Sequence, residues 1–183
     1  MSQENLTPLL EEIGHEQKER RIAALERLQG LLKEKAVDSK AIPYLVNALA
    51  SECPQERGLA IWGLGKLAQN KVRGEYPLKQ IIYLLSDDDE EIRENSAWAL
   101  GELAGIGIGG KEEIEPLNKL LYDLSASVRG MAAWALGRLA ERLQIGEISS
   151  LAHLRRLLND RSLLVQKSAS YALERLTAIH IEE

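Results

Sequence analysis

Few residues in this 183-residue chain have the type and spacing that catalysis or metal binding requires. The segment Gly105–Gly110 reads G-x-G-x-x-G, a pattern of phosphate-binding turns that needs a β-strand before it. Helical spacing precedes it here, so we expect a loop between helices. The three histidines, His15, His153 and His180, are far apart, and only His15 precedes a glutamate, Glu16. A metal centre needs more ligands than this pair, so we expect no metal site.

The single cysteine, Cys53, is also a poor candidate for chemistry. It cannot form an internal disulfide, and it lies in a Ser-Glu-Cys-Pro turn without an evident histidine partner. We therefore expect no catalytic residue, no bound cofactor and no enzymatic activity.

Charge and hydropathy limit the classes of partner. Lys and Arg number 23 against 28 Asp and Glu, a net charge of −5, which does not favour binding to nucleic acid. The first residues, 1–5, lack the basic and apolar regions of a signal peptide, and no apolar run approaches the ~20 residues that cross a bilayer. We expect a cytoplasmic protein, monomeric or weakly homodimeric, that binds neither membrane nor nucleic acid.

The structural elements that would position any functional residue recur at regular intervals along the chain. Trp62-Gly-Leu-Gly-Lys-Leu-Ala recurs at Trp98 and Trp134 in steps of 36 residues, and a related segment begins at Tyr171, 37 residues later. A degenerate first copy, aligned at Ala23, precedes Trp62 by 39 residues. Five copies fill the chain as a single domain, approximately 1–40, 41–75, 76–112, 113–149 and 150–183.

Each copy carries two helical patterns. The first is short and has apolar residues at i, i+3 and i+4, as in Ile81, Leu84 and Leu85; the second is longer and again apolar on one face. One such hairpin cannot bury its own apolar face, so neighbouring hairpins must stack. With no Phe in the chain, the core must consist of Leu, Ile, Val and Ala. The pattern predicts an all-α fold of stacked hairpins, an α-solenoid.

The repeat resembles the HEAT family, most closely the HEAT-like branch found in phycobilin lyases and many prokaryotic proteins. This resemblance implies that the α-solenoid is right-handed. The motif is Asp, four residues, Val or Ile, Arg, and then Ala-Trp-Ala-Leu-Gly, and it is complete from Asp87 and from Asp123. Other copies depart from it: Ser51 stands at the Asp position of the second copy, and Gln166 at the Arg position of the fifth. In the first copy we place Glu12 and Lys18 at these two positions.

This resemblance implies a structural ladder in which the Arg of one repeat meets the Asp of the next. The expected pairs are Arg57 with Asp87, Arg93 with Asp123, and Arg129 with Asp160.

A glycine shared by three copies, at positions 65, 101 and 137, points to close contact between helices. Glycine inside a helix costs roughly 1 kcal/mol relative to Ala, so its repetition suggests a packing benefit. The first copy carries Glu26 at this position, which the interpretation does not explain.

The family resemblance also implies that the second helices line a concave face whose variable positions bind partners. The candidate partner-binding residues are Leu59, Trp62, Lys66, Glu94, Asn95, Trp98, Glu102, Met131, Trp134, Arg138, Lys167, Tyr171 and Arg175. At helix spacings of about 8–10 Å, the aromatic residues Trp62, Trp98, Trp134 and Tyr171 would form a ridge about 30 Å long. Aromatic residues flanked by Met and Arg are typical of interface hot spots. The alternative is that each ring only packs against a neighbouring repeat.

Repeat 76–112 is acidic, with three basic residues against eight acidic ones, a net charge of −5. Acidic residues at helix N-termini can simply complement the helix dipole, or this patch can attract a basic segment. The sequence thus favours a non-catalytic scaffold or adaptor for a protein or peptide. Two alternatives stay open: an accessory subunit of a phycobilin-lyase-type or cofactor-handling enzyme, and a nucleic-acid binder, which the charge disfavours.

Overall fold

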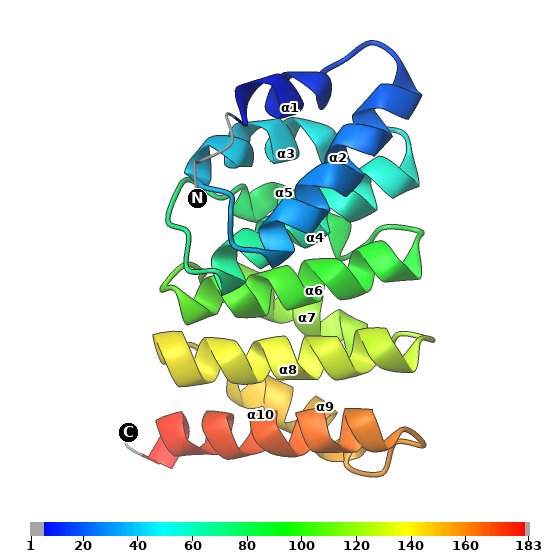
Figure 1. The fold of residues 1–183 in the computed structure, drawn as a ribbon. Helices are drawn as coiled ribbons and strands as arrows, with labels where there is room; N and C mark the ends of the chain where they lie inside the picture. The colour runs from blue at the N-terminus through cyan, green and yellow to red at the C-terminus, as the bar shows by residue number, and fades with distance from the viewer. Residues whose placement is uncertain (1–5, 182–183) are drawn as a thin grey trace.

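The computed structural model describes residues 6–181, and within them the chain forms ten α-helices and two short 3-10 turns without a strand (Figure 1). This confirms the predicted all-α fold. Residues 1–5, which were considered above for targeting, and residues 182–183 lie outside the described part. The helices are α1 (Thr7–Glu12), α2 (Lys18–Lys33), α3 (Ile42–Ala48), α4 (Pro54–Gln69), α5 (Leu78–Leu84), α6 (Glu90–Gly105), α7 (Ile114–Leu120), α8 (Ala126–Leu143), α9 (Ile148–Leu157) and α10 (Leu163–Ile181); the 3-10 turns are η1 (Ser39–Ala41) and η2 (Lys111–Glu113).

The helices pair into hairpins that stack as a solenoid. The short first helix of each hairpin packs on the long second one: α1 on α2, α3 on α4, α5 on α6, α7 on α8, and α9 on α10. The second helices also pack on one another in chain order, and Figure 1 shows α6, α8 and α10 in one layer with α7 and α9 behind them. The division of the chain into five repeats at the boundaries given above stays a prediction from the sequence.

The two layers are not packed equally. The second helices α4, α6, α8 and α10 contact their neighbours extensively, whereas contacts between successive first helices are sparse. The side of the array opposite the first helices is the exposed surface of α2, α4, α6, α8 and α10. We call this surface the second-helix face.

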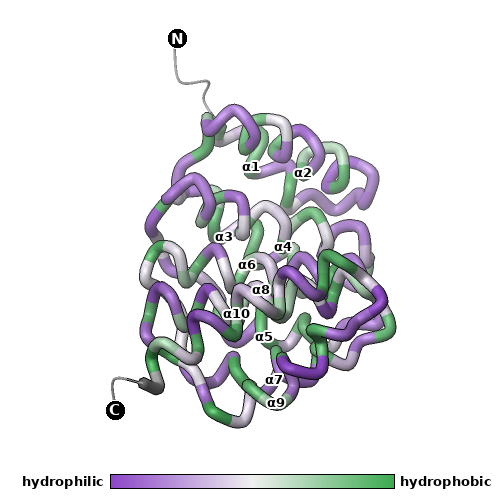
Figure 2. The backbone as a smooth tube through the Cα atoms, turned by 90° about the horizontal axis from the view of Figure 1, so that it is seen from below, coloured by the Kyte–Doolittle hydropathy of each residue, from purple (hydrophilic) through white to green (hydrophobic). Residues whose placement is uncertain are grey.

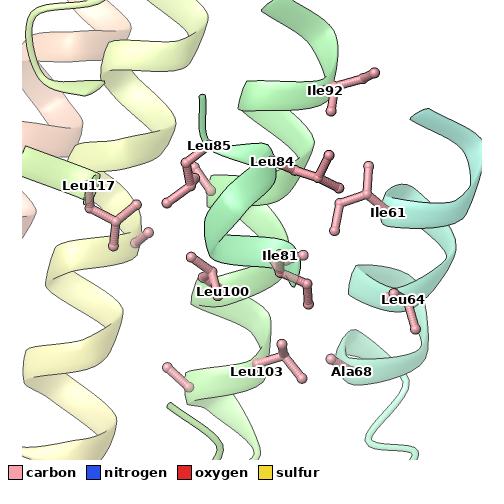
Figure 3. Packing of buried hydrophobic residues seen from close by; sticks show 14 of the residues in the cluster. Ile61, Leu64, Ala68, Ile81, Leu84, Leu85, Ile92, Leu100, Leu103 and Leu117 are labelled. Atoms are coloured by element: carbon pink, nitrogen blue, oxygen red, sulfur yellow. The ribbon is translucent and has the colours of Figure 1, made fainter. Parts of the chain in front are cut away.

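The core lies between the two layers and consists of small and branched aliphatic side chains. Figure 3 shows Leu84 of α5 pointing toward Ile61 of α4, and Leu85 pointing toward Leu117 of α7. These four side chains are at most 4% exposed. The short helix α5 thus packs on α6 of its own hairpin and contributes side chains to the contacts with the hairpins on either side.

Local sequence sets the ends and the buried sides of these helices. Pro8, Pro43 and Pro54 lie in the first turns of α1, α3 and α4, where a missing backbone N–H costs nothing. Asp89 caps α6 by accepting a hydrogen bond from the Glu91 backbone N–H at 2.9 Å. Hydrophilic and hydrophobic stretches alternate along the helices, as expected for helices buried on one side (Figure 2).

Candidate binding surface

The arginine–aspartate ladder runs along the turns between first and second helices. Arg93 illustrates its geometry: Nε and Nη2 donate to the Asp123 carboxylate of the next repeat at 2.8 and 3.1 Å. Its Nη1 donates to the Asp87 and Asp88 carbonyls of its own repeat at 2.8 and 3.0 Å. Arg57 with Asp87, and Arg129 with Asp160, repeat this arrangement. Each guanidinium therefore ties a turn of its own repeat to the following repeat.

The ladder aspartates have a second role in their own turns. The Asp160 carboxylate accepts a hydrogen bond from the Ser162 backbone N–H at 2.9 Å, and Asp87 and Asp123 accept equivalent bonds. The Arg129 guanidinium holds the pKa of Asp160 below its ordinary value, against the opposing effect of burial. These charges are engaged in joining repeats and are not available as a chemical site.

The first rung of the ladder differs from the sequence interpretation. Arg21, not Lys18, occupies the arginine position, 36 residues before Arg57. It donates to Glu56 through Nε at 3.1 Å and Nη2 at 2.9 Å, and to the carbonyls of residues 15 and 16. Glu12, which the sequence interpretation placed at the aspartate position of the first copy, pairs with the exposed Arg20. The alignment of the first copy was therefore three residues out of register.

In the second repeat, Ser51 and Glu56 together make the contacts that a single aspartate makes in the later repeats. Ser51 accepts from the Cys53 backbone N–H at 3.1 Å, which is the turn-forming bond of the aspartates. The Ser51 hydroxyl also donates to the carboxylate of Glu56 at 2.7 Å, and Glu56, only 2% exposed, supplies the charge for Arg21. The 36-residue interval between Arg21 and Arg57 was the signal in the sequence that could have revealed this rung.

The repeated glycines make room for aromatic rings of the next repeat. A Cβ at Gly65 would lie 2.5 Å from Cζ3 of Trp98, and a Cβ at Gly137 would lie 2.5 Å from Cε1 of Tyr171. A Cβ at Gly101 would overlap the ring of Trp134. In the corrected register Glu26 matches Trp62 rather than these glycines, and Gln29 takes the glycine position. Each of these rings thus packs on the preceding repeat.

The same rings keep part of their surface open. Trp62, Trp98, Trp134 and Tyr171, which we call the aromatic track, are all half-buried and lie on consecutive second helices. Trp62 and Trp98 are stacked, with ring centroids 6.4 Å apart and an interplanar angle of 28°. The two interpretations of the track are therefore compatible, because one part of each ring packs while another part remains accessible.

Charged side chains lie over three rings of the track. The Lys33 ammonium lies 5.7 Å from the Trp62 centroid, Arg138 lies 5.5 Å from that of Trp134, and Arg175 lies 5.2 Å from that of Tyr171. In residues 6–181 as described, no cation is placed over Trp98, and the residue one turn after it is Glu102.

The charged positions are cross-linked between repeats. Gln69 donates to Glu102 at 3.2 Å and accepts from Lys66 at 2.6 Å. Glu141 forms ion pairs with Arg138 at 3.1 Å and Arg175 at 3.4 Å. Within residues 6–181, Glu102 of α6 therefore has a neutral amide as its partner, whereas Glu141 of α8 is neutralised by guanidinium groups of α8 and α10.

The remaining candidate residues also lie on second helices. Leu59 and Met131 are half-buried and pack against the core, Glu94 and Asn95 are half-buried, and Lys167 is exposed. Leu59 and Asn95, together with Trp62, line a pocket of about 300 Å³ where α2, α4 and α6 meet. A larger hollow of about 690 Å³ lies elsewhere, between α3 and α5, where the first helices spread apart.

The glycine-rich segment Gly105–Gly110 and His15, which the sequence analysis considered as possible sites of chemistry, lie in a loop and a turn. Gly105 ends α6, and the loop after it contains Gly107 and Gly109 with positive φ, followed by η2 rather than a long helix. His15 accepts from the Gln17 backbone N–H at 3.0 Å, and its other ring nitrogen lies 2.8 Å from Arg20. Across the described residues no group of three or more His, Cys, Asp or Glu could hold a metal ion. None of the described helices is long and apolar enough to cross a bilayer.

Comparison with known proteins identifies the class that the fold suggests. Computationally designed armadillo repeat proteins for modular peptide recognition superpose with a TM-score of 0.76 at 22% identity, covering 93% of this chain and 81% of theirs. A designed armadillo repeat protein in complex with the peptide (KR)4 gives a TM-score of 0.70 at 23% identity over 93% and 81% of the two chains. At these identities the likeness shows the fold: the protein is a helical-repeat solenoid.

The repeat type follows from a family model described as HEAT repeats, which matches residues 42–123. This match confirms the predicted resemblance to HEAT repeats over that segment, within a chain that has the fold of a helical-repeat solenoid. No curated protein sequence matches the chain.

Proposed function

We propose that the chain binds a protein or peptide segment along the second-helix face and performs no chemistry of its own. The observation that carries this proposal is the aromatic track, in which successive repeats each present a half-buried ring followed one turn later by a charged side chain. Large rings held rigidly by a packed edge bind with little loss of conformational entropy. The designed armadillo repeat protein of similar fold, which holds the peptide (KR)4, supports a peptide as the kind of partner.

A scaffold role also fits the way the candidate residues are supported. The ladder and the glycine–ring contacts join each repeat to the next, so side chains that are distant in sequence are held in one row. Such a surface can recognise an extended segment over several repeats without a deep cavity. Cytoplasmic location and a monomeric or weakly dimeric state remain predictions from the sequence.

The proposal can be tested with peptides selected from a random display library on the immobilised protein. We expect Glu102→Arg combined with Lys167→Glu to weaken binding of the selected peptides at least about tenfold, because both side chains lie on the second-helix face and the net charge is unchanged. The matched control is Glu115→Lys with Lys119→Glu, which reverses an exposed ion pair on the first helix α7. Fluorescence anisotropy measures the affinities, and melting temperatures verify the fold.

Equal binding by wild type and the second-helix variant would refute the proposal, as would a failure to select any peptide. A pigment retained by the purified protein, detected by its absorbance, would instead favour the accessory role in a lyase.

A further inference from the structure

The pocket where α2, α4 and α6 meet has the size and walls of a site for one long side chain. Its volume is about 300 Å³, at the low end of the range for ligand pockets. Leu59, Trp62 and Ile92 give it apolar walls, and the amides of Gln29 and Asn95 add hydrogen-bonding groups. Such walls suit an amphipathic side chain, with an aliphatic stem and a polar end.

The charged side chains that line this pocket have one sign, although the Lys33 ammonium lies 5.7 Å from the centroid of Trp62, one of its walls. Asp89 and Glu91 are the charged side chains that line it in the described structure, and both are exposed. A third carboxylate, Glu26, accepts a hydrogen bond at 3.3 Å from Gln55, which also lines the pocket. The nearby guanidinium of Arg57 is already held by both oxygens of Asp87. The pocket therefore complements a positive charge.

The aromatic track shows where a second cation would fit. Its rings already accept cations of this chain, namely Lys33, Arg138 and Arg175. At the position one turn after the ring, the other repeats have Lys66, Arg138 and Arg175, whereas Glu102 follows Trp98. A cation from outside would thus restore at Trp98 the arrangement that Trp134 and Tyr171 have within the chain.

We propose that the second-helix face binds an extended basic peptide, with one Lys or Arg side chain in the pocket against Trp62 and another over Trp98 beside Glu102. This inference rests on the proposed function and adds the chemistry and position of the partner. It accounts for the net charge of −5 on repeat 76–112, which supplies Asp89, Glu91 and Glu102.

The test uses fluorescein-labelled (KR)4, with (QN)4 and (ED)4 as comparison peptides, in anisotropy titrations on the full chain. We expect (KR)4 to bind at least about tenfold more tightly than either comparison peptide, with an affinity that falls as salt rises. Asp89→Asn with Glu91→Gln should weaken binding about five- to tenfold, and Glu102→Gln at least about twofold. Asn is as good an N-cap as Asp, so α6 should still begin at residue 90.

The matched control is Asp38→Asn with Glu75→Gln. Both residues are exposed, the net charge changes equally, and Asp38 has the same capping role, accepting from the Lys40 backbone N–H at 2.9 Å. We expect this control to bind (KR)4 within about twofold of wild type.

Two results would overturn the inference: (KR)4 binding no tighter than (QN)4, or the control losing as much affinity as the pocket variant, which would indicate only a diffuse field. Neither result would contradict the proposed function if the affinity of library-selected peptides still depends on Glu102 and Lys167. Loss of that dependence would refute both.

Discussion

Gly65, Gly101 and Gly137 show how single residues set the spacing of the second helices. Each leaves the space that the aromatic ring of the next repeat occupies. Glycine is a poor helix former, and the compensating benefit is that a ring packs directly against its backbone. The cost recurs because the contact recurs.

Replacement of Gly101 by Ala should destabilise the protein by roughly 1–2 kcal/mol, because the overlap with Trp134 outweighs the gain in helix propensity. Gly30 in α2 is the matched control, since no heavy atom lies within 4 Å of a Cβ built there. Gly30→Ala should stabilise by roughly 0.5–1 kcal/mol. Urea unfolding measures both values. A neutral or stabilising Gly101→Ala would show that the ring moves aside freely.

Glu113 is a second residue whose surroundings decide its behaviour. Its side chain is fully buried, Oε1 accepts from the Gly110 backbone N–H at 3.1 Å, and Oε2 has no hydrogen-bond partner among the described residues. Burial raises the pKa of Glu113 to about 7. The folded protein therefore binds this proton more tightly than the unfolded chain does.

Stability contributed by protonated Glu113 is complete below its unfolded pKa, ordinarily 4.5, and is lost as pH rises through about 7. Relative to Glu113→Gln, the wild-type protein should lose up to about 3 kcal/mol between pH 4.5 and pH 8. Unfolding free energies of both proteins across this range provide the test. Parallel pH profiles would show that Glu113 is ionised in the folded protein at no cost.

At the scale of elements, the ladder determines how one hairpin is attached to the next. Each guanidinium joins the carboxylate of the following repeat to two carbonyls of its own turn. At the fifth repeat Gln166 donates to the Asp160 carbonyl at 2.7 Å and so keeps the bond within its own turn. The side chain at the arginine position therefore still donates to a carbonyl of its own turn, even though the fifth repeat has glutamine there.

Arg93→Ala should cost about 2–3 kcal/mol, because it leaves the 9%-exposed side chain of Asp123 without its partner and frees two carbonyls. Arg20→Ala is the control: it removes an ion pair whose members are 49% and 36% exposed, and the melting temperature should stay within error of wild type. Thermal and urea unfolding distinguish the two. Equal losses, or no loss from Arg93→Ala, would contradict a structural role for the ladder.

At the scale of the whole molecule, the second helices pack closely on one another in chain order and form one side of the array. That side carries the aromatic track, with carboxylates near α6 and guanidinium groups paired with Glu141 near α8 and α10. The two halves of one surface thus differ in charge, which would orient an extended charged partner along the array.

The sequence by itself determined the helical hairpins and their stacking, because the 3.6-residue apolar spacing and the 36-residue period can both be read directly from it. The pairing partners of the three later arginines were implied by the resemblance to HEAT repeats. The sequence did not reveal Arg21 with Glu56, since Ser51 and Glu56 share a role that one aspartate has elsewhere. Nor could it show that a ring both packs on glycine and stays accessible, or that Asp89 and Glu91 border a pocket with Trp62. Those facts depend on how helices from different repeats approach one another, and only the packed tertiary structure fixes that distance.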